Sequence, residues 1–289
     1  MREIRTIRIS QINIAMESPH SPERYIELFR QAKSIRTPII LRGDEAAILG
    51  PMDFKTYKKS GDYISGDIYK FLNIDETAQW FNTIKNEPAT EEETSNINIP
   101  SELRPNLKII EFVFHPHNHK LFFINKDRKN TLSPQFAEKF FQQLFDLACE
   151  KGKFPAVTVT AIPERESIEE IFSIPTLKKI EITLARPNPD DFEAQERKFL
   201  KKLEKQNAKR IETALIALPG KSLEPDEETR LLAQVAASNG KVIGYGLDNQ
   251  GKRIEESTKD KPMDTPYTVN SGVELSSDVL LRVSRGRIN

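Results

Sequence analysis

The chain has 289 residues, with 43 Lys or Arg and 43 Asp or Glu, so its formal net charge is zero. A neutral chain has no overall attraction to nucleic acid or to an anionic membrane, so any such binding must come from a local patch. The length corresponds to one large or two modest domains, and the 16 Phe residues can contribute to a core.

The N-terminal residues carry repeated charge and no apolar signal segment, and apolar runs such as 109–114 are far shorter than the ~20 residues that span a bilayer. The one cysteine, Cys149, cannot form an intrachain disulfide and lies in an apolar helical run, as is typical of a small core residue. These observations predict a cytoplasmic protein without a membrane partner.

Residues 1–85 are predicted to form a β-rich N-terminal domain with one helix. Isoleucines recur over residues 7–14 as in a strand, and the slip of their period between Ile9 and Ile12 predicts a bulge or a strand break near Ser10-Gln11. Ser21 followed by Pro22 is typical of a helix start. A hairpin over 38–50 and a strand over 62–71 follow.

Residues 86–106 contain prolines, the triplet Glu91-Glu92-Glu93 and few apolar groups. This composition predicts an acidic linker or exposed loop, which we take as the boundary between domains 1–85 and 107–289.

Residues 107–289 alternate between strand and helix patterns and are predicted to form a C-terminal α+β domain. The predicted strands are 107–115, 121–125, 156–162, 177–184, 211–218, 242–247 and 253–258, and the main helices start near Ser133, Asp190 and Asp226. Because several strands are joined as hairpins, the fold class is α+β (mixed α/β), with mostly antiparallel or mixed sheets covered by helices, in two domains.

Three of the four histidines lie within five residues, at His115, His117 and His119. In an extended chain these side chains would point to one side, as a metal site requires. Pro116 and Asn118 instead favour the solvated tip of a hairpin. A divalent metal is therefore an alternative to the absence of any cofactor.

A basic stripe is predicted on the helix that starts near Asp190. Its lysines follow i, i+3, i+4 and i+7 spacing, while Phe199, Leu200 and Leu203 would face the core. The stripe and the basic residues that follow it are Lys198, Lys201, Lys202, Lys205, Lys209 and Arg210. This arrangement can contact nucleic-acid phosphates, or it can be a solvated helix face whose charge is balanced by nearby glutamates.

Residues 189–198 superficially match a metal-nuclease pattern of Pro-Asp followed by Glu-x-Lys. That chemistry needs carboxylates that converge on Mg²⁺ from adjacent strands, whereas Asp190 is better explained as a helix N-cap. No serine-hydrolase, zinc-protease or dinucleotide-binding motif occurs.

The chain resembles a family of uncharacterised bacterial proteins of similar length. The matching stretches are 7–14, 53–57 with 66–69, and 118–124. From about residue 156 the layout, with its basic strand at 177–182 and late hairpin at 245–258, also resembles phage-exclusion proteins of the RexA type. The resemblance implies a role in anti-phage defence, dimer formation and DNA binding, and it transfers no active-site residues.

Together these patterns favour a non-enzymatic defence protein that contacts nucleic acid, DNA rather than RNA, through the basic stripe. It would act as a homodimer or with a partner protein of the defence system. The alternatives are a metal-dependent nuclease or hydrolase and a protein-binding subunit of a complex.

Overall fold

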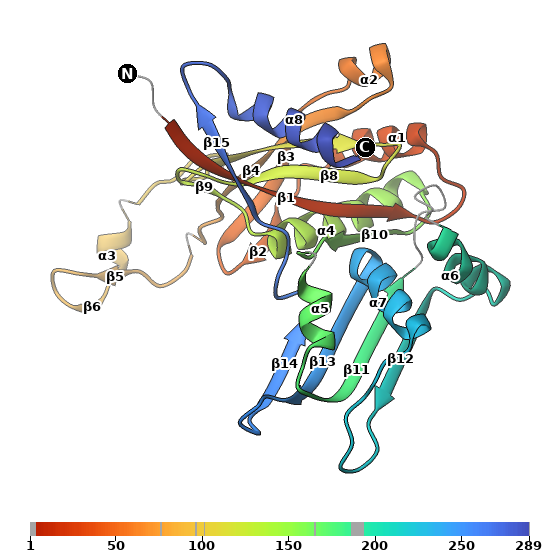
Figure 1. Ribbon diagram of the computed structural model, residues 1–289. Coiled ribbons are helices and arrows are strands. Elements are labelled where there is room, and N and C mark those ends of the chain that lie inside the picture. The colour runs from red at the N-terminus through yellow and green to blue at the C-terminus, as the bar shows by residue number, and fades with distance from the viewer. Residues whose placement is uncertain are drawn as a thin grey trace.

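The structure is a computed structural model that describes residues 4–75, 77–95, 97–100, 102–164, 166–185 and 194–288; of residues 194–196 and 200 it describes the backbone alone. The described residues form a large sheet, a small sheet and a separate short hairpin (Figure 1). The strands of the large sheet are β1 (Ile4–Met16), β2 (Ile39–Arg42), β3 (Glu45–Asp53), β4 (Ile64–Leu72), β7 (Lys108–His115), β8 (Lys120–Asp127), β9 (Asn130–Thr131), β10 (Val157–Ala161) and β15 (Thr265–Asn270).

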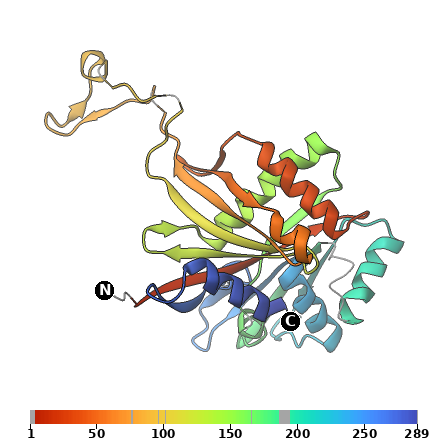
Figure 2. The ribbon, with the colours of Figure 1, turned by 90° about the horizontal axis from the view of Figure 1, so that it is seen from above.

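The large sheet is antiparallel throughout its described pairs. Its order is β10-β1-β8-β7-β4-β3-β2, with β15 beside β1 and β9 beside β8. Two long helices, α1 (Pro22–Ser34) and α4 (Pro134–Gly152), cover one face, and α8 (Ser276–Ile288) covers the other. Helices therefore shield both faces of this sheet, each over a different part (Figure 2).

The long strand β1 explains the irregular isoleucine period of the sequence. Ile7 and Ile9 are buried on the α8 face, whereas Ile12 and Ile14 are buried on the α1 and α4 face. The alternation of the strand is therefore preserved, and the change lies in which face is covered. The predicted bulge is displaced: the register shift lies between Arg8 and Ile9, in the pairing with β8.

The helix starts of α1 and α4 follow the predicted capping chemistry. The Ser21 hydroxyl accepts a hydrogen bond from the Arg24 amide, and the Ser133 hydroxyl accepts one from the Phe136 amide. Aromatic rings from both helices meet in the core, where Phe29 and Phe141 are fully buried.

Strand β10 forms one edge of the large sheet, and α4 covers the outward-facing amides of this edge. The Val159 amide donates to the Gln142 side chain at 2.8 Å, and the Ala161 amide donates to the Glu138 carboxylate at 2.7 Å. These contacts satisfy donors that would otherwise be open to another strand.

The small sheet consists of β11 (Thr176–Ala185), β12 (Arg210–Ile216), β13 (Gly240–Leu247) and β14 (Arg253–Ser257), in the order β12-β11-β13-β14. The helices α5 (Glu166–Phe172), α6 (Ala194–Lys205) and α7 (Glu227–Asn239) contribute to one apolar cluster on one face of this sheet. Ile180, Ile182 and Leu184 of β11 point into that cluster. The alternate residues of β11 therefore lie on the opposite face, which these helices do not cover.

The segment between β4 and β7 projects away from both sheets (Figures 1 and 2). It contains the hairpin β5 (Phe81–Asn82) and β6 (Glu87–Pro88) and the one-turn helix α3 (Glu91–Thr94). Because β4 and β7 pair with each other, the expected linker at 86–106 lies within a connection between neighbouring strands of one sheet. Strands from both sides of that segment build the large sheet.

The predicted α+β class with mostly antiparallel sheets covered by helices is confirmed. Within the part of the chain that the structure describes, no helix combines the length and the apolarity that crossing a membrane requires.

Candidate functional site

Helix α6 presents the predicted basic face to solvent. Lys201, Lys202 and Lys205 are exposed, while Phe199 and Leu203 are buried on the side that faces the protein. The side chain of Leu200 lies outside the described residues. Lys198 is exposed and forms an ion pair with Glu228 of α7 at 2.8 Å. This pair holds the pKa of Glu228 below its usual value, first through the hydrogen bond from Lys198 and then through its charge.

Lys209 and Arg210 connect this helix to a second feature of the structure. They follow α6 along the chain, with Lys209 just before β12 and Arg210 as its first residue, and both line a pocket between the two sheets. The pocket has a volume of about 400 Å³. The predicted basic set is therefore divided, with four lysines on the helix and two cations in the pocket.

The strand registers explain how the pocket forms. In β11, Thr183 and Ala185 lie on the face opposite the helix-covered residues. Lys241 of β13 is directly opposite Thr183, and Arg210 of β12 is directly opposite Ala185, so all four point to the same side of the small sheet. The uncovered face of the small sheet therefore supplies one wall of the pocket.

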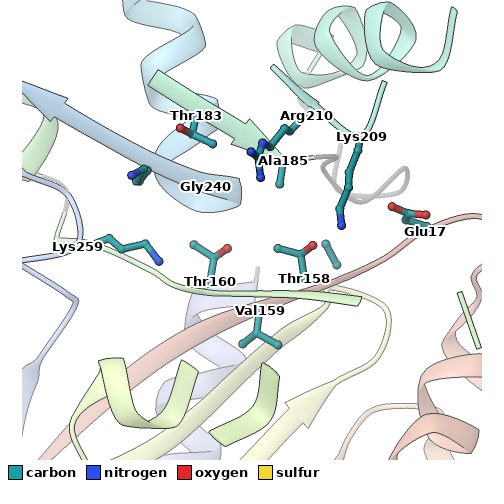
Figure 3. A pocket seen from close by; sticks show the side chains of 12 residues that line it. Glu17, Thr158, Val159, Thr160, Thr183, Ala185, Lys209, Arg210, Gly240 and Lys259 are labelled. Atoms are coloured by element: carbon teal, nitrogen blue, oxygen red, sulfur yellow. The ribbon is translucent and has the colours of Figure 1, made fainter. Parts of the chain in front are cut away.

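The other wall comes from edge strand β10 of the large sheet. Val157, Val159 and Ala161 pack in the core under α4, so the intervening Thr158 and Thr160 project the other way. Figure 3 shows the side chains of Thr158 and Thr160 pointing into the pocket from β10, toward the side from which Lys209 and Arg210 enter.

The charge balance of the pocket is positive. Four cations line it, Lys209, Arg210, Lys241 and Lys259, with Glu17 as the carboxylate among the lining residues. Two of the cations have acidic partners that do not line the pocket: Arg210 pairs with Glu212 at 2.7 Å and Lys259 pairs with Glu138 at 2.6 Å. Lys209 and Lys241 form no ion pair with a residue that the structure describes.

The three clustered histidines lie around the β7–β8 hairpin and are not brought together. The His115 ring is buried on the α8 side, where its Nε2 lies 2.9 Å from the Ser284 hydroxyl. His119 is buried on the opposite side against Tyr25, with a ring-centroid distance of 4.9 Å. His117 lies in the turn near Tyr57. The hairpin turn breaks the extended alternation on which a shared metal site would depend.

Burial changes the titration of two groups that the sequence had singled out. It lowers the pKa of His115 to about 4, so this imidazole is neutral at physiological pH. It raises the pKa of the Cys149 thiol to about 11, which disfavours the reactive thiolate. Cys149 packs against the main core, as its apolar surroundings predicted.

The metal-nuclease pattern starts at Pro189 and Asp190, which lie outside the described residues. Among the residues whose placement is described, no group of three or more His, Cys, Asp or Glu side chains is arranged to hold a metal ion.

Several pocket residues had no local signal in the sequence. The alternation of Val and Thr over residues 157–160 was visible, but nothing indicated which partner its polar side would face. Lys241 lies in β13, Lys259 comes after β14 and Glu17 follows β1, so these residues meet only through the tertiary fold.

The fold and the site define an α+β protein in which two antiparallel sheets, covered by helices, enclose a basic pocket next to a basic helix. The chain belongs to the family described as Domain of unknown function (DUF4747), whose sequence profile matches residues 5–285. The predicted membership in a family without an assigned function is therefore confirmed. No curated protein matches the chain.

Proposed function

We propose that this protein binds nucleic acid, DNA in preference to RNA, through the basic face of α6, as a non-enzymatic component of bacterial anti-phage defence. The observation that carries the proposal is the exposure of Lys201, Lys202 and Lys205 on one face of α6, with the exposed Lys209 and Arg210 next along the chain. The resemblance of the C-terminal half to phage-exclusion proteins supports the defence role.

The size of the basic face sets the number of phosphates that it can contact. At 1.5 Å per residue, the seven steps from Lys198 to Lys205 span ~10 Å of helix. Lys198 is already paired with Glu228, so the strongest phosphate contacts are expected from the other cations. Contacts to three or four phosphates correspond to a log–log salt slope of about −3 to −4 on duplex DNA.

The proposal is tested by fluorescence anisotropy with labelled duplex and single-stranded DNA and RNA at low and physiological salt. Reversal of two charges in Lys201→Glu/Lys202→Glu is expected to abolish binding. The matched control is Lys58→Glu/Lys59→Glu, which changes the net charge equally at exposed positions of α2 (Lys55–Ser60). Equal affinities of the two variants would contradict the assignment, because they would make the interaction a matter of total charge alone.

A second candidate function, a protein-binding subunit of a defence complex, is favoured by the projecting segment between β4 and β7. Its hairpin exposes Phe81 and Ile84, with 58% and 95% of their surfaces accessible. Exposed apolar side chains on a protrusion are typical of protein contacts. Co-purification of a partner from native cells, and its loss in Phe81→Ser/Ile84→Ser, would test this role.

A further inference from the structure

We infer that the pocket between the two sheets is a binding site for a phosphate monoester, supplied by a mononucleotide or by the phosphorylated end of a nucleic-acid strand. This inference goes beyond the proposed function, because α6 does not line the pocket and the two sites can be altered separately.

The first step of the argument is the direction from which the cations approach. Arg210 comes from β12, Lys241 from β13, and Lys259 follows β14. In Figure 3, Lys259 and Thr160 lie on one side of the space and Arg210 on the other. A group surrounded in this way suits a terminal phosphate, whose three free oxygens can accept charge-assisted hydrogen bonds from several directions.

The second step is the donor chemistry between the cations. Three hydroxyls line the pocket, from Thr158 and Thr160 of β10 and Thr183 of β11. None of them donates to a side chain or carbonyl that the structure describes. A phosphate accepts hydrogen bonds and donates none when fully ionised, so hydroxyl donors and cations together match it.

The third step concerns size and the remainder of the ligand. A volume of about 400 Å³ lies in the range of small-molecule sites, which begin near ~300 Å³. The side chains of Ala15 and Ala185 provide apolar lining, and no aromatic ring is present among the lining residues. Recognition is therefore expected to depend on the phosphate rather than on stacking with a base.

Glu17 allows a test in which two substitutions have opposite effects on phosphate affinity. Its carboxylate lines the same pocket and would repel a bound phosphate, whereas Lys241 would attract it. Figure 3 shows Glu17 at the end of the pocket where Lys209 enters. Substitutions at Glu17 and Lys241 should therefore change phosphate affinity in opposite directions.

The experiment is isothermal titration calorimetry of the full chain with inorganic phosphate, 5′-AMP and a short oligonucleotide with or without a 5′-phosphate. The wild-type chain should bind inorganic phosphate, and it should bind the oligonucleotide with a 5′-phosphate more tightly than the same oligonucleotide without one. Lys241→Gln should weaken phosphate binding by about tenfold, as expected for loss of one charged hydrogen-bond donor. Glu17→Gln should strengthen it, and Thr160→Val, which removes one hydroxyl with little change in volume, should weaken it.

The ligands distinguish the two sources of the phosphate. Tighter binding of 5′-AMP than of the phosphorylated oligonucleotide would identify the free nucleotide, and the reverse order would identify a strand end. Absence of phosphate binding, or equal effects of Lys241→Gln and Glu17→Gln, would overturn the inference. Circular dichroism of each variant establishes that it is folded.

The same titration separates this site from the proposed function. Lys201→Glu/Lys202→Glu should keep the phosphate affinity of the wild-type chain. If that variant binds phosphate while the wild-type chain fails to bind duplex DNA, the proposed function fails and the pocket assignment stands.

Discussion

Replacement of Gly240 by alanine tests the strand packing in the small sheet, which supplies one wall of the pocket. Gly240 begins β13 and lies directly opposite Leu184 of β11. A Cβ added at this position would lie 2.0 Å from the Thr183 carbonyl oxygen, well inside the 3.0 Å below which real contacts of this kind essentially never occur. Relief of the contact requires β13 to move away from β11 by about 1 Å, which disturbs the paired backbone at the end of the small sheet.

Overpacking of this kind costs about 1–3 kcal/mol of unfolding free energy. With a urea m-value of about 3 kcal/mol/M, the unfolding midpoint should fall by about 0.3–1 M when it is followed by circular dichroism. The matched control is Gly286→Ala in α8, where an added Cβ meets no atom within 4 Å. A helical alanine at that position should stabilise the chain by up to about 1 kcal/mol. An unchanged midpoint in Gly240→Ala would refute the close approach of β13 to β11.

Three further stability predictions follow from buried groups. Phe141→Ala removes a fully buried ring that contacts four other phenylalanines and should cost about 3–5 kcal/mol in a urea titration. A loss below about 1 kcal/mol would contradict its core position. Burial first, and then the charge of the directly opposed Asp67, raise the pKa of Glu111, so the chain loses stability as pH rises through the folded-state pKa of this residue. Glu111→Gln should therefore be more stable than wild type at about pH 7. The difference in stability between the two chains should disappear near about pH 4. Burial alone would raise the pKa of Asp127, but hydrogen bonds from Arg5 and Ser276 outweigh burial and lower the pKa. The stabilisation by the Asp127 carboxylate is present above the unfolded-state pKa of about 3.9 and is lost as pH falls through the folded-state pKa. In thermal melts, Asp127→Asn should therefore be less stable than wild type at about pH 7 and should approach wild type below about pH 4.

Local patterns predicted the elements whose signals are contained within a few residues. Ser21 and Ser133 mark the starts of α1 and α4 because a capping hydroxyl acts on an amide three residues away. The hairpin turn at Gly43 was visible for the same reason, since a positive φ of 50° favours glycine.

Elements that depend on distant pairing were missed. Strand β15 pairs with β1 across most of the chain, and its six residues include Pro266 and three polar residues, so that they show little apolar–polar alternation. Helix α8 buries Val279, Leu280 and Val283, but serines, arginines and Gly286 dilute its apolar stripe. Neither segment shows in its own composition that it is needed to cover the second face of the large sheet.

The candidate site also contains one part that local sequence patterns predicted and one part that they did not. Helical spacing correctly separated the exposed lysines of α6 from the buried Phe199 and Leu203, because that distinction is local. The pocket joins residues from β10, β11, β12 and β13, and its formation depends on which face of each sheet the helices leave open. Because the open faces are determined by packing between distant elements, the pocket does not correspond to a local sequence motif.

The central claim, that the basic face of α6 contacts nucleic-acid phosphates, is tested most directly by the salt dependence of duplex DNA affinity. Anisotropy titrations of the wild-type chain across a range of salt concentrations should give a log–log slope of about −3 to −4, and removal of one contact in Lys205→Gln should reduce its magnitude by about 0.9. A wild-type affinity that does not change with salt, or a slope that Lys205→Gln leaves unaltered, would contradict the account.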